Sequence, residues 1–435
     1  MNTIENIKER LLGRQFINGS TELTAIEHGA VNAFNTLGVP TSRNEEWKYT
    51  RIGSVFNKEF TFISGNNNFS FSSDHLNSIR IPGYEQANEI FFINGIYSAA
   101  LSVIRSSELV ILPLNVAAIE YNQIISAHLG HSSKYLKDGI HALNTAFVKD
   151  GMFIYIKAGE VTEHPVYIYN ITDASSESIL SQPRSLVYIS ENAQVEIVET
   201  YHTFGKAESF TNQVLEIILQ QNAVVGYYKI QDDEAYTSLV STTHFRLVGK
   251  SYMHAVTISL NGDLIRNNLN IALEAEHCEA HLYGLYFLKG KTHVDNHTVV
   301  DNAMPHCLSN QLYKGIINDT ATAVFNGKIF VQPDAQKTNA YQSNKNILLS
   351  DSASVNTKPQ LEIFADDVKC SHGCTIGKLD EEGMFYLRSR GISENIARSL
   401  LIHAFAVDIL DHIKLIPLRN YINDLISERL EFDIA

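Results

Sequence analysis

A pattern of a turn, one small residue and a β-strand recurs through the middle of this chain. The central small residues are Ala193, Ala223, Ser251, Cys278, Ala303, Ala321 and Ala353. They lie roughly 18 to 32 positions apart and about 27 on average, which is the length of one coil of a β-solenoid. One coil cannot bury its own inner face, so the coils must stack on one another. The pattern therefore predicts a mainly β fold with one elongated core.

The sequence between residues 90 and 376 alternates between apolar and polar residues in almost every segment, as in MFIYIKAG, PVYIYNI and QVEIVET. Alternation with a period of two is typical of β-strands. No long helical window is present in this range, which excludes βαβ units. We therefore expect a solenoid without internal helices.

Helical periodicity marks both ends of the chain. At the N-terminal end it covers residues 3–37, and an Asn- and Ser-rich stretch at 64–78 is typical of a mobile connection. We divide the chain into an N-terminal helical region with a linker (1–80), a β-solenoid core (81–377) and a C-terminal helical domain (378–435).

The C-terminal domain carries signals for three helices. Asp380 suits the start of the first helix and Gly391 its end. Ser393 is an N-cap for the second helix, and Pro417 stands where the third begins. The second helix has a stripe of apolar residues, namely Ile396, Leu400, Leu401, Ala404, Phe405, Val407 and Leu410. This stripe is broader than one packing face needs, so we expect part of it to contact another protein.

Charge and cysteine content exclude several classes of function. The 48 acidic residues outnumber the 34 Lys and Arg residues, which gives a net charge of -14. Nucleic-acid binding needs a basic surface, and the sequence has no basic run. No stretch approaches the roughly 18 apolar residues that span a bilayer, and the N-terminus lacks the apolar core of a signal peptide. We expect a cytoplasmic protein with no nucleic-acid or membrane partner, in which the cysteines stay thiols.

Two Gly-Lys-Ser/Thr sequences, at 249–251 and 290–292, resemble the end of a phosphate-binding loop. Neither has the preceding glycine at the required position. His244 stands there in the first, and Gly284 is one residue too far upstream in the second. Without a glycine-rich turn, backbone N–H groups cannot surround a phosphate. We interpret both as turns and expect no nucleotide hydrolysis by this chain alone.

Three histidines and a cysteine, His293, His297, His306 and Cys307, lie close together in the sequence. His and Cys are zinc ligands, and a spacing of four suits zinc on a helix. On a strand, the same spacing puts His293 and His297 about 13 Å apart on one face. We therefore favour a structural role between coils for these residues, and likewise for Cys278 as a small buried residue.

The strongest candidate for metal binding lies at the end of the predicted core, where Cys370, His372 and Cys374 occupy alternate positions after two aspartates. Alternate side chains on a strand share one face. Thiol and imidazole groups suit iron, zinc or the edge of an iron–sulfur cluster. Cys370 and His372 alone do not complete a site, so a second protein would have to supply the remaining ligands.

Alternation upstream predicts where these side chains point. Leu361, Ile363 and Ala365 share one parity, which we expect to be the solenoid interior. Cys370 and His372 have the other parity and are expected to point outward.

Three longer motifs resemble the SufB/SufD family of the SUF iron–sulfur cluster assembly system. They are GVPTSRNEEWKYT at 38–50, the segment at 305–353 that begins PHCLSNQLYKGI, and ADDVKCSHGCTIGKLDEEGMFYLRSRGI at 365–392. The resemblance covers the second half of the chain densely and the N-terminal region by one motif. The tryptophan motif and the strand with Cys370 and His372 are more similar to the SufD members of the family than to the SufB members.

The resemblance implies a right-handed parallel β-helix flanked by helical N- and C-terminal domains, and the role of a non-catalytic scaffold subunit. It also implies pairing with a SufB-like subunit through the β-helices. A SufC-like ABC-type ATPase would dock on the C-terminal helices. The partner-binding candidates on those helices are Phe385, Tyr386, Leu400 and Phe405.

The resemblance also assigns roles to the candidate ligands. It places the functional histidine of the family at His372 and its neighbouring thiol at Cys370, facing a cysteine of the SufB-like subunit. Cys374 departs from the family pattern, since many relatives carry alanine there, and is either an extra ligand or a small residue in a turn. No intrinsic cofactor is implied. Iron or an iron–sulfur cluster would be held transiently in the complex, and flavin binding by the complex stays open.

Two other functions are compatible with a β-solenoid. A polysaccharide-active β-helix enzyme would have a similar fold, but such enzymes are usually secreted and present a charged cleft along one face. The missing signal peptide argues against this function. A purely structural adaptor differs from the scaffold only in the role of His372.

Overall fold

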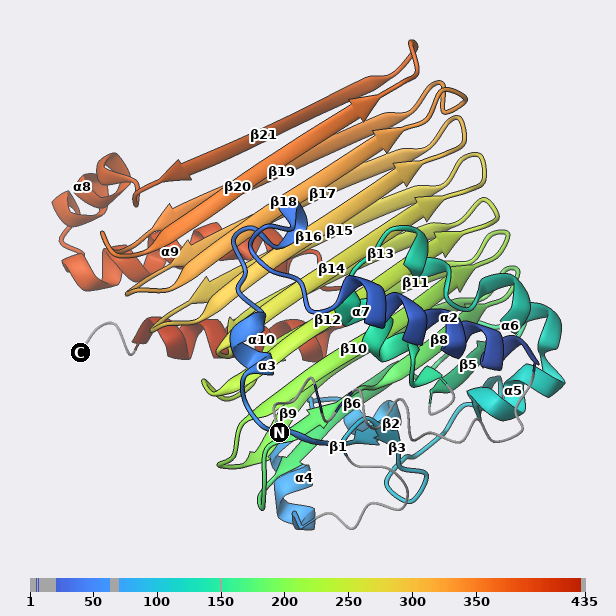
Figure 1. Cartoon of the computed structure of the whole chain (residues 1–435). Coiled ribbons are helices and arrows are strands. Elements are labelled where there is room, and N and C mark those ends of the chain that lie inside the picture. The colour runs from blue at the N-terminus through green and yellow to red at the C-terminus, as the bar shows by residue number, and fades with distance from the viewer. Residues whose placement is uncertain (1–4, 6, 8–20, 63–69, 149–150, 432–435) are drawn as a thin grey trace.

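The computed structural model describes residues 5, 7, 21–62, 70–148 and 151–431. Two long, mostly parallel β-sheets face each other and form a β-solenoid (Figure 1). Through the regular part of the solenoid, consecutive strands belong to opposite sheets, and each strand pairs with the strand two places later. The prediction of a mainly β solenoid core between helical ends is confirmed.

The strands divide between two sheets, called sheet A and sheet B. Sheet A contains β1 (Thr61–Phe62), β4 (Leu109–Pro113), β5 (Met152–Ile156), β7 (Ile179–Ser181), β8 (Arg184–Ile189), β10 (Ser209–Leu219), β12 (Thr237–Leu247), β14 (Leu264–Leu273), β16 (His293–Asn302), β18 (Thr322–Val331) and β20 (Ser354–Ile363). Sheet B contains β2 (Asn88–Ile93), β3 (Ile96–Tyr97), β6 (Val166–Ala174), β9 (Gln194–Gly205), β11 (Val224–Asp232), β13 (Tyr252–Asn261), β15 (Glu279–Leu288), β17 (Leu308–Ile317), β19 (Asn339–Leu348) and β21 (Lys369–Gly377).

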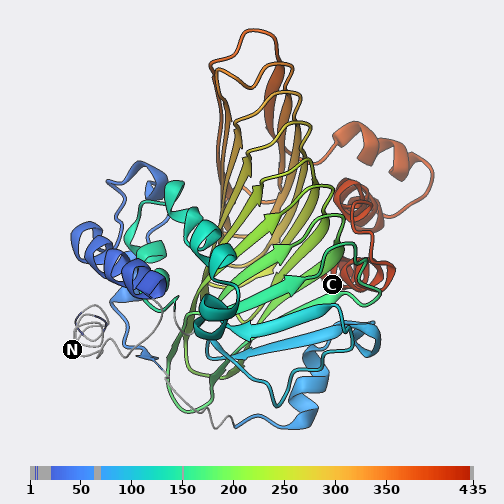
Figure 2. The same cartoon turned by 90° about the vertical axis from the view of Figure 1, so that its right-hand side faces the viewer.

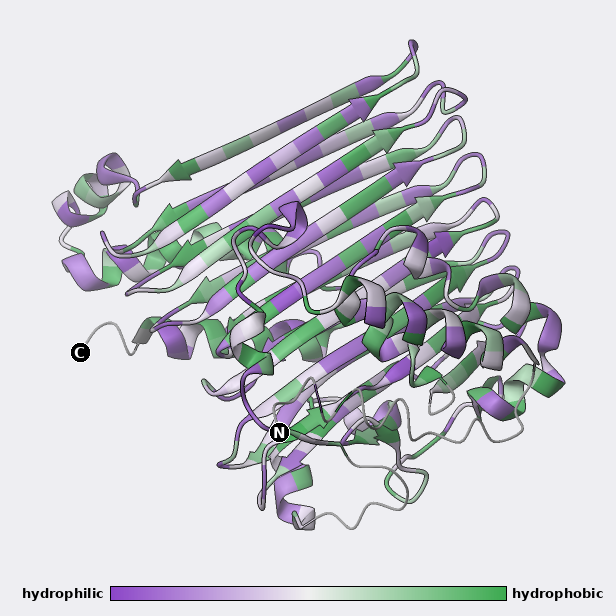
Figure 3. Cartoon of the chain, viewed as in Figure 1, coloured by the Kyte–Doolittle hydropathy of each residue, from purple (hydrophilic) through white to green (hydrophobic). Residues whose placement is uncertain are grey.

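Side chains alternate between the solenoid interior and its outer faces, and Figure 3 shows the resulting changes of hydropathy along the strands. On β14, for example, Ile265, Leu269 and Ile271 belong to the inner core, whereas Arg266 and Asn268 have the opposite parity. The inner core is one continuous cluster that both sheets share along the whole solenoid. This is the single elongated core that the repeat predicts.

One corner of the solenoid is built from the recurring small residues. The buried residues that precede the sheet B strands in successive coils are Ala193, Ala223, Ser251, Cys278, Cys307 and Thr338. The carbonyl oxygen of each accepts a hydrogen bond from the next coil, as from Val224 N–H to Ala193 (2.9 Å) and from Leu308 N–H to Cys278 (3.0 Å).

The repeat in the sequence therefore reflects the coils of the solenoid, but its residues lie at two different corners of the coil. Ala321 and Ala353 precede strands of sheet A, and Cys307 rather than Ala303 is the corner residue of its coil. Cys278 is confirmed as a small buried residue, since only 1% of it is exposed. Cys307 has the same role.

Helices cover the outer face of sheet A (Figure 2). They are α2 (Thr21–Leu37), η1 (Glu45–Trp47), α3 (Gly53–Phe56), α5 (Leu114–Glu120), α6 (Asn122–His128), η3 (His131–Lys134) and α7 (Gly139–Thr145). Phe34 of α2 and Ile140 of α7 join one cluster with Phe210 and Val240 of sheet A. The expectation that no helix lies within residues 90–376 is wrong, because α5, α6 and α7 do.

The segment before the solenoid also differs from its expected structure. The sequence predicts a mobile connection at residues 64–78. This expectation is wrong for the second half of the stretch, because helix α4 (Ser73–Ile79) begins there. Ser72 caps α4 by accepting a hydrogen bond from His75 N–H, and the short helix η2 (Tyr84–Gln86) follows. Residues 8–20 and 63–69 lie outside the described ranges. The domain limits at 80 and 377 stay a prediction.

Three C-terminal helices follow the solenoid as the sequence predicts: α8 (Glu381–Ser389), α9 (Glu394–Leu410) and α10 (Ile416–Glu431). Asp380 accepts a hydrogen bond from Glu382 N–H (3.1 Å) and Ser393 from Ile396 N–H (3.4 Å), so both are N-caps. Gly391, with φ +84°, follows the end of α8.

The last two of these helices cover the outer face of sheet B. Ile402, Ile409 and Ile422 are buried in one cluster with Tyr228 and Leu285 of the sheet. Most of the apolar surface of α9 and α10 is therefore used inside the chain. Among the described residues, no helix is long and apolar enough to cross a membrane.

Buried histidines between sheet A and the N-terminal helices predict an acid-sensitive fold. Burial lowers the pKa of His141 from 6.5 to about 4 and that of His244 from 6.5 to about 3. In the unfolded chain both residues take up a proton near pH 6.5, whereas in the folded chain they stay neutral to lower pH. Their contribution to stability is therefore complete above about pH 6.5 and is lost as the pH falls toward 4.

We expect the free energy of unfolding, measured by urea titration, to fall by on the order of 3 kcal/mol between about pH 7 and about pH 4.5. The variants His141→Gln and His244→Gln should each show a shallower dependence on pH. An equally steep dependence in both variants would contradict the assignment to these two histidines.

Candidate functional site

The last coil of the solenoid consists of β20 and β21 (Figure 1). β20 pairs with β18 and β21 pairs with β19, and neither has a partner on its other side among the described strands. In Figure 2 the helices lie beside the solenoid and leave this end uncovered. Both strands therefore offer unpaired backbone N–H and C=O groups at one open end.

The three candidate ligands lie on the inner face of β21. In register, Cys370 lies next to Ala340, His372 next to Gln342 and Cys374 next to Asn344. These three β19 residues are 0%, 3% and 0% exposed, so they fill the interior. Cys370 itself packs against the inner core.

The expectation that Cys370 and His372 point outward is therefore wrong. The inward direction of two of the three upstream residues is confirmed, because Ala365 belongs to the inner core and Leu361 packs against it. Ile363 has the same parity but is 41% exposed and is not part of this core. The chain leaves the strand after Ile363 and enters the next one at Lys369. The intervening turn contains the two aspartates and changes the parity, so alternation on β20 does not carry over to β21.

The geometry of the candidate ligands is that of a partial metal site at most. Neighbours of one parity on a strand are about 6.5 to 7 Å apart, which allows two of them to reach one metal ion or cluster edge. Burial raises the pKa of the Cys370 thiol, so without a metal it stays protonated at neutral pH. The described residues contain no group of three or more His, Cys, Asp or Glu side chains that could hold a metal ion. A metal ion at Cys370, His372 and Cys374 would therefore need ligands from beyond the described residues.

Polar residues that the sequence reasoning missed lie directly inside the last coil. Gln342 Nε2 donates a hydrogen bond to Gln311 Oε1 (3.1 Å), and Gln311 Nε2 donates to Thr298 Oγ1 (2.6 Å). Within the described part of the chain, Gln342 Oε1 has no partner although it is buried. The sequence does contain a signal for them, namely amide side chains at the alternate positions Gln342, Asn344 and Asn346. This pattern indicates a polar interior only once these side chains are known to point inward.

The partner-binding candidates on α8 and α9 differ in exposure. Phe385 is 76%, Tyr386 57% and Leu400 48% exposed. Phe405 is half-buried, and the Lys314 ammonium lies 4.4 Å from the centre of its ring. Ile396, which belongs to the predicted stripe, is 49% exposed. Three of the four candidates are therefore available to a partner, while Phe405 mainly contacts its own sheet.

The tryptophan motif is fixed to the outer face of sheet A. Trp47 is 1% exposed, its Nε1 donates to Asp138 Oδ2 (3.2 Å), and the Arg266 guanidinium lies 3.9 Å from the centre of its ring. Arg266 also donates to the Glu46 carbonyl oxygen (2.7 Å) and pairs with Asp295 (2.6 Å). A segment far away in the sequence is thereby held on the middle of the solenoid.

The histidines of β16 take part in this attachment. Thr50 Oγ1 lies 2.9 Å from His293 Nε2, and the Glu46 carboxylate lies 3.4 Å from His297 Nδ1. Both histidines contact the N-terminal segment, and His293 also contacts the next coil, as expected, since its Nδ1 lies 2.6 Å from Thr322 Oγ1 of β18. His306 stacks on His277 in the corner turns, with ring centres 4.9 Å apart.

Both Gly-Lys-Ser/Thr sequences lie in turns between strands, as predicted. The first connects β12 to β13, and the second connects β15 to β16. The absence of nucleotide hydrolysis stays a prediction.

The fold and the site together define a class of protein: a two-sheet parallel β-solenoid with helical ends, whose open last coil carries thiol and imidazole groups. Residues 170–405 match the model described as SUF system FeS cluster assembly, SufBD core domain, and residues 14–168 match the SufBD protein N-terminal region. The chain belongs to the SufBD family of the SUF iron–sulfur cluster assembly system.

Individual relatives agree with this membership. An iron–sulfur cluster assembly SufBD family protein of Synechocystis is 34% identical over 92% of this chain and 90% of its own length. The iron–sulfur cluster assembly protein SufD of Escherichia coli is 28% identical over 90% of both chains. The chloroplastic protein ABCI7 of Arabidopsis thaliana is 33% identical over 62% of this chain and 58% of its own length.

Proposed function

We propose that this chain is a non-catalytic, cytoplasmic scaffold subunit that pairs with a SufB-like subunit through the open end of its solenoid. The observation that carries the proposal is the coincidence of two features at one place. The unpaired edges of β20 and β21 lie at the end that also presents Cys370, His372 and Cys374. An exposed strand edge is a ready template for pairing with another chain.

The chemistry of the exposed groups supports a role in handling iron. Thiolate and imidazole are good iron ligands, and both must be deprotonated to bind. Cys370 becomes a thiolate only when a metal offsets the cost of burial, since burial raises its pKa. In this proposal iron or a nascent cluster is cargo: Cys370 and His372 supply part of its ligands, and a partner cysteine supplies another. Cys374 is a further candidate ligand in this proposal, and the case for it is weaker than for Cys370 and His372.

The C-terminal helices support docking of a SufC-like ATPase. Phe385, Tyr386 and Leu400 form an exposed group of large apolar side chains on α8 and α9. Aromatic residues of this kind are enriched among the residues that contribute most to protein interfaces. The neighbouring β-sheet is already covered by α9 and α10, so this group is left for another protein.

The other functions that a solenoid allows are less well supported. Helices cover much of the outer faces of both sheets, which leaves less room for a long polysaccharide cleft (Figure 2). A structural adaptor without metal chemistry would present the same edges and the same exposed helices. The two differ only in what His372 does, and a substitution there separates them.

Co-expression with a SufB-like and a SufC-like chain tests the proposal. We expect one complex that contains all three chains and that forms an iron–sulfur cluster, visible by absorption, when iron and sulfide are supplied without oxygen. A variant in which Val355 and Thr357 of β20 are both replaced by proline should lose the SufB-like chain, because proline cannot donate to a new ladder. Retention of that chain would reject pairing through this edge.

A further inference from the structure

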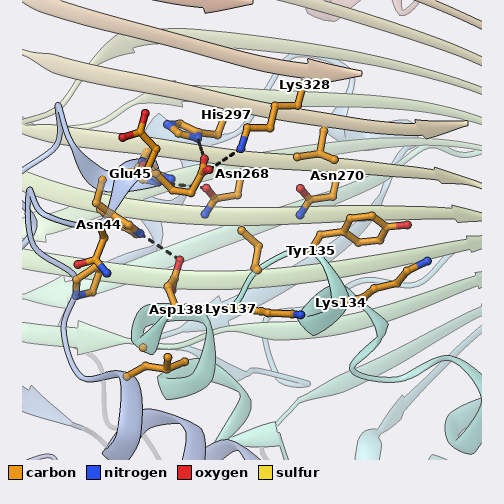
Figure 4. Close-up of a pocket in the computed structure, with 18 of the residues that line it drawn as sticks. Asn44, Glu45, Lys134, Tyr135, Lys137, Asp138, Asn268, Asn270, His297 and Lys328 are labelled. Carbon is orange, nitrogen blue, oxygen red and sulfur yellow. Dashed lines mark hydrogen bonds and ion pairs between the residues drawn. The ribbon is translucent and has the colours of Figure 1, made fainter. Parts of the chain in front are cut away.

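A cavity of about 430 Å³ lies between the outer face of sheet A and the N-terminal helical layer (Figure 4). Strands β14, β16 and β18 form its floor. Residues 37–47 form one wall, and η3 with the start of α7 forms another. A cavity of this size holds a ligand as large as a typical cofactor or drug molecule. None of the residues of β21 lines it, so it is separate from the candidate metal ligands.

The carboxylates in the cavity wall are all engaged by groups of this chain. The interactions are Glu45 with Lys358, Glu46 with Lys328 and His297, and Asp138 with Trp47 and the first N–H groups of α7. The hydrogen bond from His297 and the charge of Lys328 lower the pKa of Glu46 to about 2, although burial opposes them. These acids therefore have little capacity left for a cationic ligand.

Two donors in the same cavity have no partner among the described residues, and a third is only weakly paired. Asn270 of β14 is 1% exposed, and its Nδ2 has no hydrogen-bond partner in the described part of the chain. A buried donor without a partner costs roughly 1–3 kcal/mol, so a ligand that accepts from it would be stabilised. At the rim, Lys137 makes no ion pair with any described residue. Lys134 is 55% exposed and has two long ion pairs, at 3.8 Å from Asp301 and 3.9 Å from Glu274.

The rest of the floor is suited to an apolar body. In register, Asn270 lies beside Val299, and Val299 lies beside Lys328, so a donor, an apolar group and a cation follow one another across the sheet. Phe330 and Leu136 add further apolar lining. Figure 4 labels Asn270, Tyr135, Lys134 and Lys137 among the residues that line the cavity.

We propose that this cavity binds a small organic anion. The acid group, a carboxylate or a phosphate, accepts from Asn270 Nδ2 and is attracted by Lys134 and Lys137. The flat or apolar body packs on Val299 and Phe330. This site is independent of the proposed scaffold function, because it involves neither the open end of the solenoid nor the exposed group on α8 and α9.

The single tryptophan of the chain reports directly on this cavity, because Trp47 lines it. Nitroaromatic compounds quench tryptophan fluorescence, which allows three probes of one size to be compared. We expect saturable quenching by para-nitrobenzoate, by para-nitrophenyl phosphate, or by both, and no saturation with the neutral para-nitrobenzyl alcohol. The tighter of the two acids identifies the acid group that the site prefers. Linear quenching by all three, or equal binding of the alcohol, would overturn the proposal.

Two variants test the residues named. Asn270→Leu removes the donor at nearly constant volume, and Lys137→Glu reverses an exposed charge that the fold does not need. Each should weaken binding of the preferred acid by about tenfold. Lys345→Glu, which reverses an exposed charge on β19, should leave it unchanged. If Lys137→Glu and Lys345→Glu have the same affinity as the unmodified chain, the site assignment is wrong, whether or not Asn270→Leu folds.

Discussion

Replacing His372 with alanine should lower the yield of iron–sulfur cluster in the assembled complex by at least about tenfold, while the chain stays folded and both partners stay bound. His372 is exposed on the inner face of the last strand, so removing its imidazole leaves no cavity in the core. Under the proposed function, the chain then loses one of its few iron ligands, and the two thiols alone should not replace it. Iron and sulfide content and visible absorption after anaerobic reconstitution measure the yield.

Matched variants separate a ligand from a structural residue. His164→Ala removes a half-buried histidine of a turn far from the open end and should leave the yield unchanged. His372→Cys restores a soft ligand and should recover part of the yield, whereas His372→Leu should not. A normal yield in His372→Ala would leave the chain as a structural adaptor.

The fold could be predicted from the sequence where strands are long and regular. The strands from β13 to β20 are ten residues long and separated by short turns. In β20 the alternation is clear, with Val355, Leu361 and Ile363 at one parity. In β16 and β19 polar residues occupy both parities, so there the regular spacing of the turns supports the prediction. The helices α5, α6 and α7 were inaccessible to the same reasoning because each has only seven residues. All seven residues of α7 are buried, between sheet A and α2, so the helix has no solvent-exposed face, and its buried His141, Asn144 and Thr145 obscure the usual pattern of an amphipathic helix.

The residues of the candidate site could be predicted from the sequence, but the direction in which their side chains point could not. Cys370 and His372 follow from their chemistry and spacing, because soft ligands at alternate positions share a face. Whether that face is the inner or the outer one depends on the length of the turn after Ile363, and no sequence rule fixes this length.

The choice of Ala303 as a repeat position is wrong for the same reason. Ala303 and Cys307 lie in one turn, and only the pairing of the strands shows that Cys307 is the residue at the corner.

The sequence also could not show which residues of the apolar stripe on α9 pack inside the chain and which stay exposed. A broad stripe predicts that more than one surface is contacted, but it does not say which residues serve which surface. Ile402 and Ile409 turn toward sheet B, and Leu400 and Ile396 turn away from it. Deleting α9 and α10 would therefore uncover the sheet as well as remove the docking surface. Point substitutions at exposed positions are the sharper test.

The double variant Phe385→Ser, Tyr386→Ser should weaken binding of the SufC-like ATPase by about 100-fold, which corresponds to about 2.7 kcal/mol. Both side chains are exposed in the isolated chain, so their loss should not change the free energy of unfolding by more than about 0.5 kcal/mol. Leu400→Ser should have a smaller effect in the same direction. Isothermal titration of the purified ATPase into the chain measures the affinity, and urea unfolding checks the fold.

The matched control lies on the opposite side of the solenoid. Ile119 of α5 is 76% exposed, as is Phe385, so Ile119→Ser removes a comparably exposed apolar side chain from the N-terminal helices. Its ATPase affinity should equal that of the unmodified chain, because a buried aromatic anchor contributes through its particular pocket and not through exposed apolar area in general. Equal affinity of all the variants would place the ATPase elsewhere on the chain. Equal weakening by Ile119→Ser and the double variant would mean that the loss reflects general surface hydrophobicity.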